Sequence, residues 1–177
     1  SSTLINNIAN WAEVDPYKLL ANTFRGSGYD IAAAQHDSPI LFSLIEGAPV
    51  TKEIDIPWNF TDRLFFVYLN KKQNSREGIK QYHSKPKINA ELISGISLLT
   101  SKIINSTSLI DFENLITAHE EIISKIIEQD SVKKIFFQDY SGSIKSLGAW
   151  GGDFILVTGY EMKMDYFREK GYKTIIP

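Results

Sequence analysis

The feature that most constrains the fold is the order of the apolar segments after residue 60. The stretch "LFFVYL" at 64–69 is continuous, aromatic and β-branched, which is typical of a buried strand. A polar loop follows, and apolar residues then recur at helical spacing over 88–105 and 109–128. One buried strand followed by two long amphipathic helices predicts helices packed against a sheet.

The rest of this region predicts a small antiparallel sheet. The further elements expected are a helix at 131–139, strands at 143–148 and 153–159, a helix at 161–170 and a closing strand at 172–176. Gly171 is suited to end the last helix, because glycine readily takes the left-handed conformation found there. The resulting order, β-α-α-α-β-β-α-β, predicts an α+β fold in which helices cover one face of a ferredoxin-like layer.

The first part of the chain predicts three short helices and a β-hairpin. The helices are expected at 3–12, 16–24 and 29–35, and the hairpin strands at 40–47 and 50–57. Asp15 is expected to cap the second helix, with Pro16 at its first position. Gly47-Ala48-Pro49 is expected to form the hairpin turn. We therefore predict two domains, 1–58 and 59–177.

Composition excludes several classes of function. The chain has 177 residues and a net charge of −2, so it carries no basic footprint for nucleic acid. It has no cysteine, which excludes disulfides and thiol nucleophiles and fits a cytoplasmic location. No apolar run approaches the roughly 20 residues that span a bilayer, so no membrane partner is expected. His36, His83 and His119 are too far apart to suggest a zinc site.

The first residues already lie in an amphipathic helix. Leu4, Ile8 and Trp11 fall at helical spacing directly after "SST", with no preceding strand or methionine. This start predicts that the chain is the back part of a longer protein.

Three segments carry the candidate chemistry, and each has a structural alternative. "SST" at 1–3 would offer helix N–H groups to a phosphate, or would simply cap the helix. "GSGYD" at 26–30 places Asp30 where it would accept a proton from a substrate hydroxyl, or where the helix dipole favours an acid. "GAWGG" at 148–152 has more glycines than a hairpin requires, which indicates close approach to a ligand; a plain hairpin is the alternative.

Taken in order, these segments resemble the GHMP kinase superfamily, which includes galactokinases, homoserine kinases, mevalonate kinases and phosphomevalonate kinases. Ser1-Ser2 resembles the end of its "GLGSSAA" phosphate loop. "GSGYDIAAA" looks like the G-S-G-x-D motif of phosphomevalonate kinases, and "GYDIA" is similar to the hallmark of a bacterial subgroup. "KSLGAWGGDFIL" resembles the third motif, commonly G-A-G-G-G. The resemblance covers nearly the whole chain.

The resemblance implies a fold and an activity. Residues 1–58 would be the end of a ribosomal-S5-like N-terminal domain, and 59–177 the ferredoxin-like C-terminal domain. The activity would be transfer of the γ-phosphoryl group of ATP, with Mg²⁺, to a hydroxyl- or phosphate-bearing metabolite, with the mevalonate route of isoprenoid biosynthesis as the implied setting. The implied partners are this small-molecule substrate, the missing N-terminal half of the protein and a second copy in a homodimer.

The resemblance also implies roles for individual residues. Asp30 would be the catalytic residue, and Ser2 would contact the metal. The phosphate-binding residues would be Ser1, Ser2, Gly148, Ala149, Gly151 and Gly152. The substrate-binding residues would be Gly26, Ser27, Gly28, Tyr29, Ser75 and Trp150.

Two departures from the family pattern keep other functions open. Trp150 stands where the third motif usually has glycine, and Ser75-Arg76 where members often have a Ser-Thr pair. A protein of this fold that binds a ligand without turnover is therefore one alternative. A ferredoxin-like interaction or RNA-binding module is another, which the net charge disfavours.

Two charged side chains outside these motifs are expected to have structural rather than catalytic roles. Lys145 is expected to be a solvated strand lysine, with a phosphate ligand as the alternative. His119 is expected to lie on the surface or to pack between helices.

Overall fold

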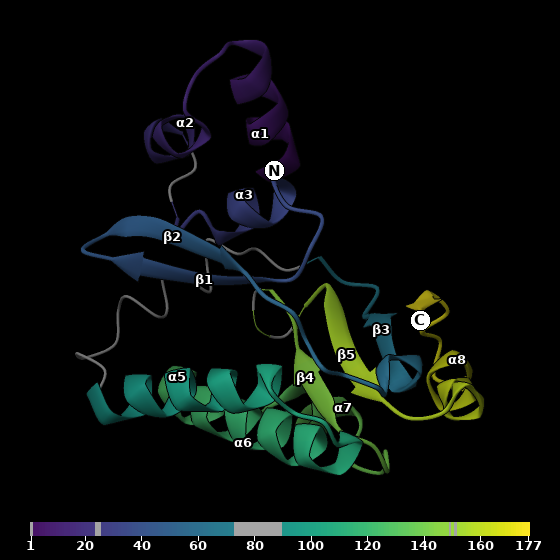
Figure 1. Cartoon of the computed structure of the whole chain (residues 1–177). Helices are drawn as coiled ribbons and strands as arrows, with labels where there is room; N and C mark the ends of the chain where they lie inside the picture. Colours follow the sequence, from purple (N-terminus) through teal and green to yellow (C-terminus); the bar gives the residue numbers. More distant parts are fainter. Residues whose placement is uncertain (1, 24–25, 73–89, 149, 151) are drawn as a thin grey trace. The chain divides into compact units, whose positions relative to one another are not determined.

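The computed structural model describes residues 2–23, 26–72, 90–148, 150 and 152–177. The chain divides into two compact units, Ser1–Ile56 and Pro57–Pro177 (Figure 1). Each unit is described by itself.

The first unit begins with the three predicted helices, α1 (Ser2–Trp11), α2 (Pro16–Asn22) and α3 (Tyr29–Ala34). Asp15 caps α2 as predicted, because its Oδ1 accepts a hydrogen bond from the Tyr17 backbone N–H at 2.8 Å. Helix α1 packs on α2 and α3, and its Ile5 and Ala9 are buried.

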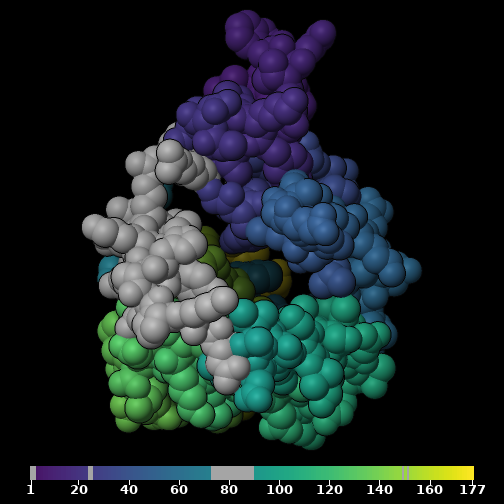
Figure 2. Space-filling view, turned by 90° about the vertical axis from the view of Figure 1, so that its left-hand side faces the viewer, coloured from purple at the N-terminus to yellow at the C-terminus, as the bar shows by residue number. Residues whose placement is uncertain are grey.

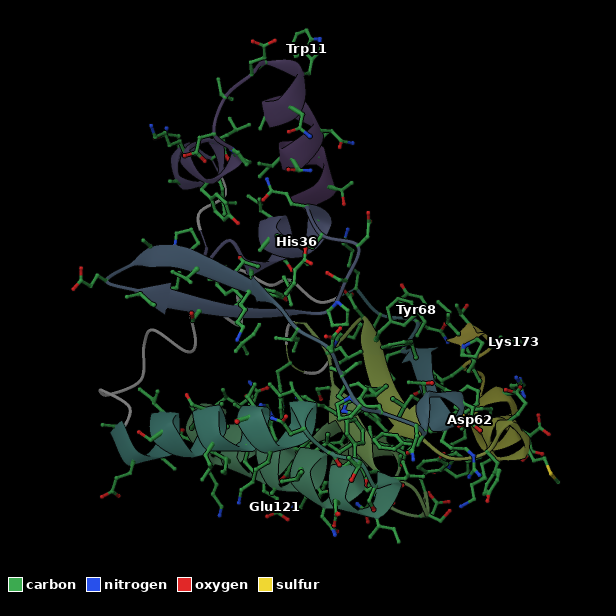
Figure 3. All side chains as sticks on the ribbon, viewed as in Figure 1. Trp11, His36, Asp62, Tyr68, Glu121 and Lys173 are labelled. Carbon is green, nitrogen blue, oxygen red and sulfur yellow. The ribbon has the colours of Figure 1, made fainter. Side chains whose placement is uncertain are left out.

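An adjacent face of α1 stays exposed and apolar. It carries Leu4, Ile8 and Trp11, and Trp11 is 86% exposed. Figure 3 shows the Trp11 side chain projecting away from the helices of this unit. The helix is therefore apolar on two faces, of which the described residues cover only one.

The hairpin forms between β1 (Ile40–Ile45) and β2 (Ala48–Glu53), which pair antiparallel. The prediction of a turn at Gly47-Ala48-Pro49 was wrong by one residue. The turn is Glu46-Gly47, and both residues have positive φ, 52° and 81°. Two consecutive left-handed residues match the twist of a two-residue hairpin, so Pro49 lies within β2, opposite Leu44.

The second unit contains a four-stranded sheet. Its strands are β3 (Leu64–Tyr68), β4 (Ile144–Ser146), β5 (Phe154–Thr158) and β6 (Ile175–Ile176). Their order across the sheet is β4-β5-β3-β6, and every pair is antiparallel. This is the arrangement of a split β-α-β layer, as the order of elements predicts.

The helices of this unit lie where the periodicity predicts them. Those in the described part of the unit are α5 (Ala90–Ile104), α6 (Leu109–Ile127), α7 (Val132–Phe136) and α8 (Asp165–Glu169). Helix α5 lies on the surface of its unit and buries none of its residues fully (Figure 2). The helix predicted at 161–170 begins as a 3-10 turn, η2 (Glu161–Met164), which brings Met164 fully into the core. A second short 3-10 turn, η1 (Thr61–Arg63), leads into β3.

The sheet is apolar on both faces, which explains the continuous hydrophobic run of β3. Phe65 and Val67 belong to one core and Leu64 to another. The first core also contains Val132, Phe137, Tyr140, Ile144, Ile155, Val157, Met164 and Phe167. The second contains Phe60, Phe112, Ile116 and Leu156. Helix α6 therefore covers one face, and α7 and α8 cover the other. The prediction that the helices cover one face of the sheet was wrong, because the strands carry apolar side chains on both faces and each face has to be buried.

Candidate functional site

Asp30 lies in the first turn of α3, and its side chain is exposed. The turn before it depends on Gly28, whose φ of 84° favours glycine. A Cβ at Gly28 would also lie 2.8 Å from the ring of Tyr17, so α2 packs directly against this backbone. Ile31 and Ala32 are buried directly after the acid. The sequence "GSGYD" therefore presents an exposed carboxylate on a backbone that is packed on both sides of it, by Gly28 before it and by Ile31 and Ala32 after it.

Tyr29 is the side chain most closely associated with Asp30. Burial, the charge of Asp30 and a hydrogen bond from the Tyr29 hydroxyl to its carboxylate raise the pKa of Tyr29 to about 12. The Tyr29 ring contacts Phe42 of β1 edge-on, with 6.5 Å between the ring centroids. Tyr29 therefore connects Asp30 to the hairpin of the first unit.

Some of the other residues predicted to form the site lie within the described part of the chain, and some do not. Gly26 has a φ of 122°, and a Cβ added there would meet no described atom within 4 Å. The Ser27 hydroxyl accepts a hydrogen bond from the Tyr29 N–H at 3.5 Å. Ser2 is the first residue of α1. Ser1 and Ser75 lie outside the described residues.

The third motif forms the connection between β4 and β5 in the second unit. Gly148 is exposed with a φ of 61°, Trp150 is half-buried and Gly152 is buried. Ala149 and Gly151 lie outside the described residues. Asp30 and this turn belong to different units.

The turn is fastened to the end of β3 by backbone hydrogen bonds through Asp153. The Leu69 N–H donates to the Asp153 carbonyl at 2.7 Å, and the Asp153 N–H donates to the Lys71 carbonyl at 2.8 Å. Asp153 itself has a left-handed φ of 53°. The β4–β5 turn and the lysines that follow β3 are therefore neighbours.

A charged cluster joins α6 to β4, immediately before this turn. The Lys145 ammonium donates to His119 Nδ1 at 3.1 Å and to Glu120 Oε1 at 3.4 Å. The Lys145 side chain is 22% exposed and that of Glu120 only 5%. The neighbouring Glu121 instead points outward from α6 (Figure 3). Lys145 was expected to be solvated, and this was wrong: it is the counter-ion of a buried carboxylate.

Burial governs the protonation of this cluster. It raises the pKa of Glu120 and lowers that of Lys145, while their mutual attraction opposes both shifts. Burial and the Lys145 charge lower the pKa of His119 to about 4. His119 is therefore neutral at pH 7, with Nδ1 as the acceptor and the proton on Nε2. Because Glu120 already neutralises Lys145, the cluster holds α6 on β4 rather than offering a free cation to phosphate.

The low pKa of His119 predicts a pH dependence of stability. Its unfolded pKa is about 6.5, so acidification from pH 7 to 5 protonates the unfolded chain first and lowers the free energy of unfolding, by about 1–2 kcal/mol. Urea unfolding of the wild type and His119→Gln at both pH values measures this loss. The raised pKa of Glu120 makes acidification increase the free energy of unfolding. Because Glu120 is present in both proteins, this contribution is common to them. An equal loss in the variant would contradict the assignment.

Comparison with known proteins gives a likeness to a solved structure. No family model matches the chain, and no curated protein matches it. Among solved structures, the chain is similar to L. major mevalonate kinase in complex with R-mevalonate, with a TM-score of 0.64 and 17% identity. The likeness covers 88% of this chain and 53% of that chain.

The chain is therefore similar in fold to part of that mevalonate kinase. Its combination of helices and two antiparallel sheets agrees with the predicted α+β class. The chain spans about half the length of that kinase. At 17% identity the likeness concerns the fold, and activity has to be argued from the residues themselves.

Two further observations concern ligands and membranes. In the part of the chain that the structure describes, no three His, Cys, Asp or Glu side chains gather as a metal site. Nor does any described helix combine the length and apolarity that a membrane span requires.

The Lys145–Glu120 pair was not predicted from the sequence. The available signal was the position of Lys145 in a short strand between two inward-facing residues, opposite a helix that carries an acid. Sequence spacing alone gives no register between α6 and β4, so the pairing required the structure.

Proposed function

We propose that the chain is the C-terminal part of a GHMP-type kinase that transfers the γ-phosphoryl group of ATP to a small metabolite. The observation that carries the proposal is the mevalonate-kinase fold in a chain that places an exposed carboxylate, Asp30, directly after a left-handed glycine turn. The acceptor would bear a hydroxyl or phosphate group, and the mevalonate pathway in the cytoplasm is the proposed setting.

In this proposal Asp30 positions the acceptor. Its carboxylate orients the acceptor group and takes the proton of a reacting hydroxyl, while that oxygen bonds to the γ-phosphorus and ADP leaves. The residues from Gly26 to Tyr29, with Ser75 and Trp150, contact the substrate. The turn from Gly148 to Gly152, with Ser1 and Ser2, contacts phosphates. Phosphoryl transfer depends mainly on positioning and charge neutralisation, which a fixed carboxylate and a glycine turn are suited to provide.

The donor set is compatible with Mg²⁺. The ion would neutralise charge on the phosphate oxygens, and at such sites it usually binds one or two carboxylates, phosphate oxygens and water rather than an all-protein cage. An exposed single carboxylate such as Asp30 fits this pattern. Ser2 is proposed as an additional ligand.

We also propose that a further polypeptide segment, corresponding to the unmatched part of the mevalonate kinase, completes the fold. The chain covers 53% of that kinase. The exposed apolar face of α1, formed by Leu4, Ile8 and Trp11, is the proposed contact surface. A second copy of the chain, in a homodimer, is the other proposed partner.

The proposal is tested by ADP release with Mg-ATP. The protein assayed would be the complete polypeptide in which this chain occurs, with mevalonate, phosphomevalonate, homoserine and galactose as candidate acceptors. Turnover with one acceptor is the expected result. No turnover with any of the four would contradict the proposal in its present form.

The alternative is a protein of the same fold that binds a ligand without turnover. Trp150 motivates it, because an indole occupies a position where the family has glycine. Calorimetric binding of ATP without ADP release would favour this alternative.

A further inference from the structure

Strand β4 lies at the edge of the sheet of the second unit, and its outer side has no neighbouring strand among the described residues. Backbone hydrogen bonds join Ser143 to Thr158 at 3.0 Å and Leu147 to Phe154 at 3.2 Å. In an antiparallel pair, alternate residues bond to the same neighbour, so the odd-numbered residues of this segment face β5. The N–H and C=O of Ile144 therefore point away from the sheet.

Side chains cover this outer edge on both sides of Ile144. The Lys133 ammonium donates to the Gly142 carbonyl at 2.6 Å. Burial raises the pKa of Glu120, and the Ser146 N–H is among the groups that oppose this shift, so Glu120 lies at the other side. Ile144 is only 3% exposed, yet its N–H and C=O have no hydrogen-bond partner in the described part of the chain. Because buried backbone groups are nearly always paired, an additional partner is expected here.

A groove with a volume of about 1010 Å³ opens at this edge. Its walls are α6, α7 and the connection between them, and Ile144 of β4 also lines it. Every lining residue belongs to the second unit and to its described part. Because β4 is recessed between two helices, the equally recessed β4 of a second copy cannot reach it. A single extended segment can, and the addition of a strand to a sheet edge is a recurring way of binding peptides.

The charges of the groove favour a basic segment. Its lining contains four carboxylates and three ammonium groups. Two of the ammonium groups are already paired, because Lys133 bonds to a backbone carbonyl and Lys134 to Asp130 at 2.6 Å. The Oε2 atom of Glu120 is buried without a hydrogen-bond partner among the residues described, and Glu121 is exposed. The groove therefore complements positive charge.

The pleat of the strand determines where this positive charge should lie. Ile144 packs in the same core as Val132 of α7, whereas Lys145 contacts Glu120 of α6. A residue that pairs with Ile144 has its side chain on the α7 side, and the residues before and after it have theirs on the α6 side, where Glu120 and Glu121 lie. A segment with basic residues on both sides of a β-branched residue therefore matches this edge.

We propose that this groove binds an extended peptide segment of the type basic–β-branched–basic, and that the central residue of the segment forms two backbone hydrogen bonds with Ile144. The segment thereby becomes an additional strand beside β4. The proposal is independent of phosphoryl transfer, because it involves neither Asp30 nor the β4–β5 turn.

Amide hydrogen exchange of the ¹⁵N-labelled chain, followed by NMR, tests the pairing. In the free chain the Lys145 amide, which faces β5, is expected to exchange slowly, and the Ile144 amide at least tenfold faster. Saturation with the capped peptide acetyl-Thr-Lys-Val-Lys-Thr-amide is expected to slow exchange at Ile144 at least tenfold. An Ile144 amide that the peptide leaves unchanged would overturn the inference. Protection of Ile144 in the free chain would do the same, including protection that fades on dilution, which would identify a second copy as the partner.

Matched peptides and variants separate backbone pairing from charge. N-methylation of the central valine removes the donor to the Ile144 carbonyl and is expected to raise the dissociation constant about tenfold. A peptide with glutamate in place of both lysines is expected to bind more weakly still. Glu121→Gln should raise the dissociation constant of the lysine peptide about threefold, whereas Glu169→Gln, at the end of α8, should leave it unchanged. No binding of the lysine peptide, or equal affinities within any of these pairs, would contradict the inference.

Discussion

Replacing Asp30 by asparagine is expected to lower kcat for phosphoryl transfer by about 10²–10⁴-fold, the usual contribution of a general base. The amide has the size of the carboxylate but neither takes a proton nor carries charge. The backbone should be unaffected, because the side chain is exposed and α3 is held by the buried Ile31 and Ala32. ADP release with the best acceptor measures the effect.

A matched control separates catalysis from general charge. Asp37 is another exposed acid of the first unit, seven positions further along the chain. Asp37→Asn removes the same charge and should leave kcat within about twofold of the wild type. Tyr29→Phe removes the hydroxyl that donates to Asp30 and should have an intermediate effect. If Asp30→Asn and Asp37→Asn retain equal activity, Asp30 is a helix-start residue and the binding protein becomes the better interpretation.

The fold of the second unit was largely predictable because its signals are local. A continuous β-branched run, two long apolar stripes and a glycine after the last helix each mark one element. The turn at Glu46-Gly47 was harder to predict from the sequence. Glutamate rarely adopts a positive φ, and the proline suggested that the turn lay one residue later. The 3-10 start of the last helix followed from the packing of Met164, which the pattern of the segment does not encode.

The candidate site was predictable only in its parts. Gly28 and Asp30 are neighbours in sequence, so a glycine turn followed by an exposed acid is a local property. The roles of Lys145 and Glu120 depend on contact across 25 positions, and sequence spacing does not determine such contacts.

Gly142→Ala is expected to lower the free energy of unfolding of the second unit by about 3 kcal/mol or more. A Cβ at this position would lie 2.2 Å from the Thr158 carbonyl oxygen and 2.8 Å from the Tyr140 ring. Thr158 ends β5 and is fully buried. Its carbonyl also accepts the Tyr140 hydroxyl at 2.8 Å. Relief of the clash therefore requires a central strand to move.

The same substitution at Gly95 should have the opposite sign. Gly95 lies inside α5 of the same unit, and a methyl group added there would meet no described atom within 4 Å. Alanine there should stabilise the helix by about 0.5–1 kcal/mol, since glycine loses more backbone entropy on folding. Urea unfolding of the two variants beside the wild type measures both effects. Equal urea midpoints of unfolding for Gly142→Ala and the wild type would mean that the segment before β4 can shift to accommodate a methyl group without loss of stability. That segment would then not be a rigid support for the strand that leads into the β4–β5 turn.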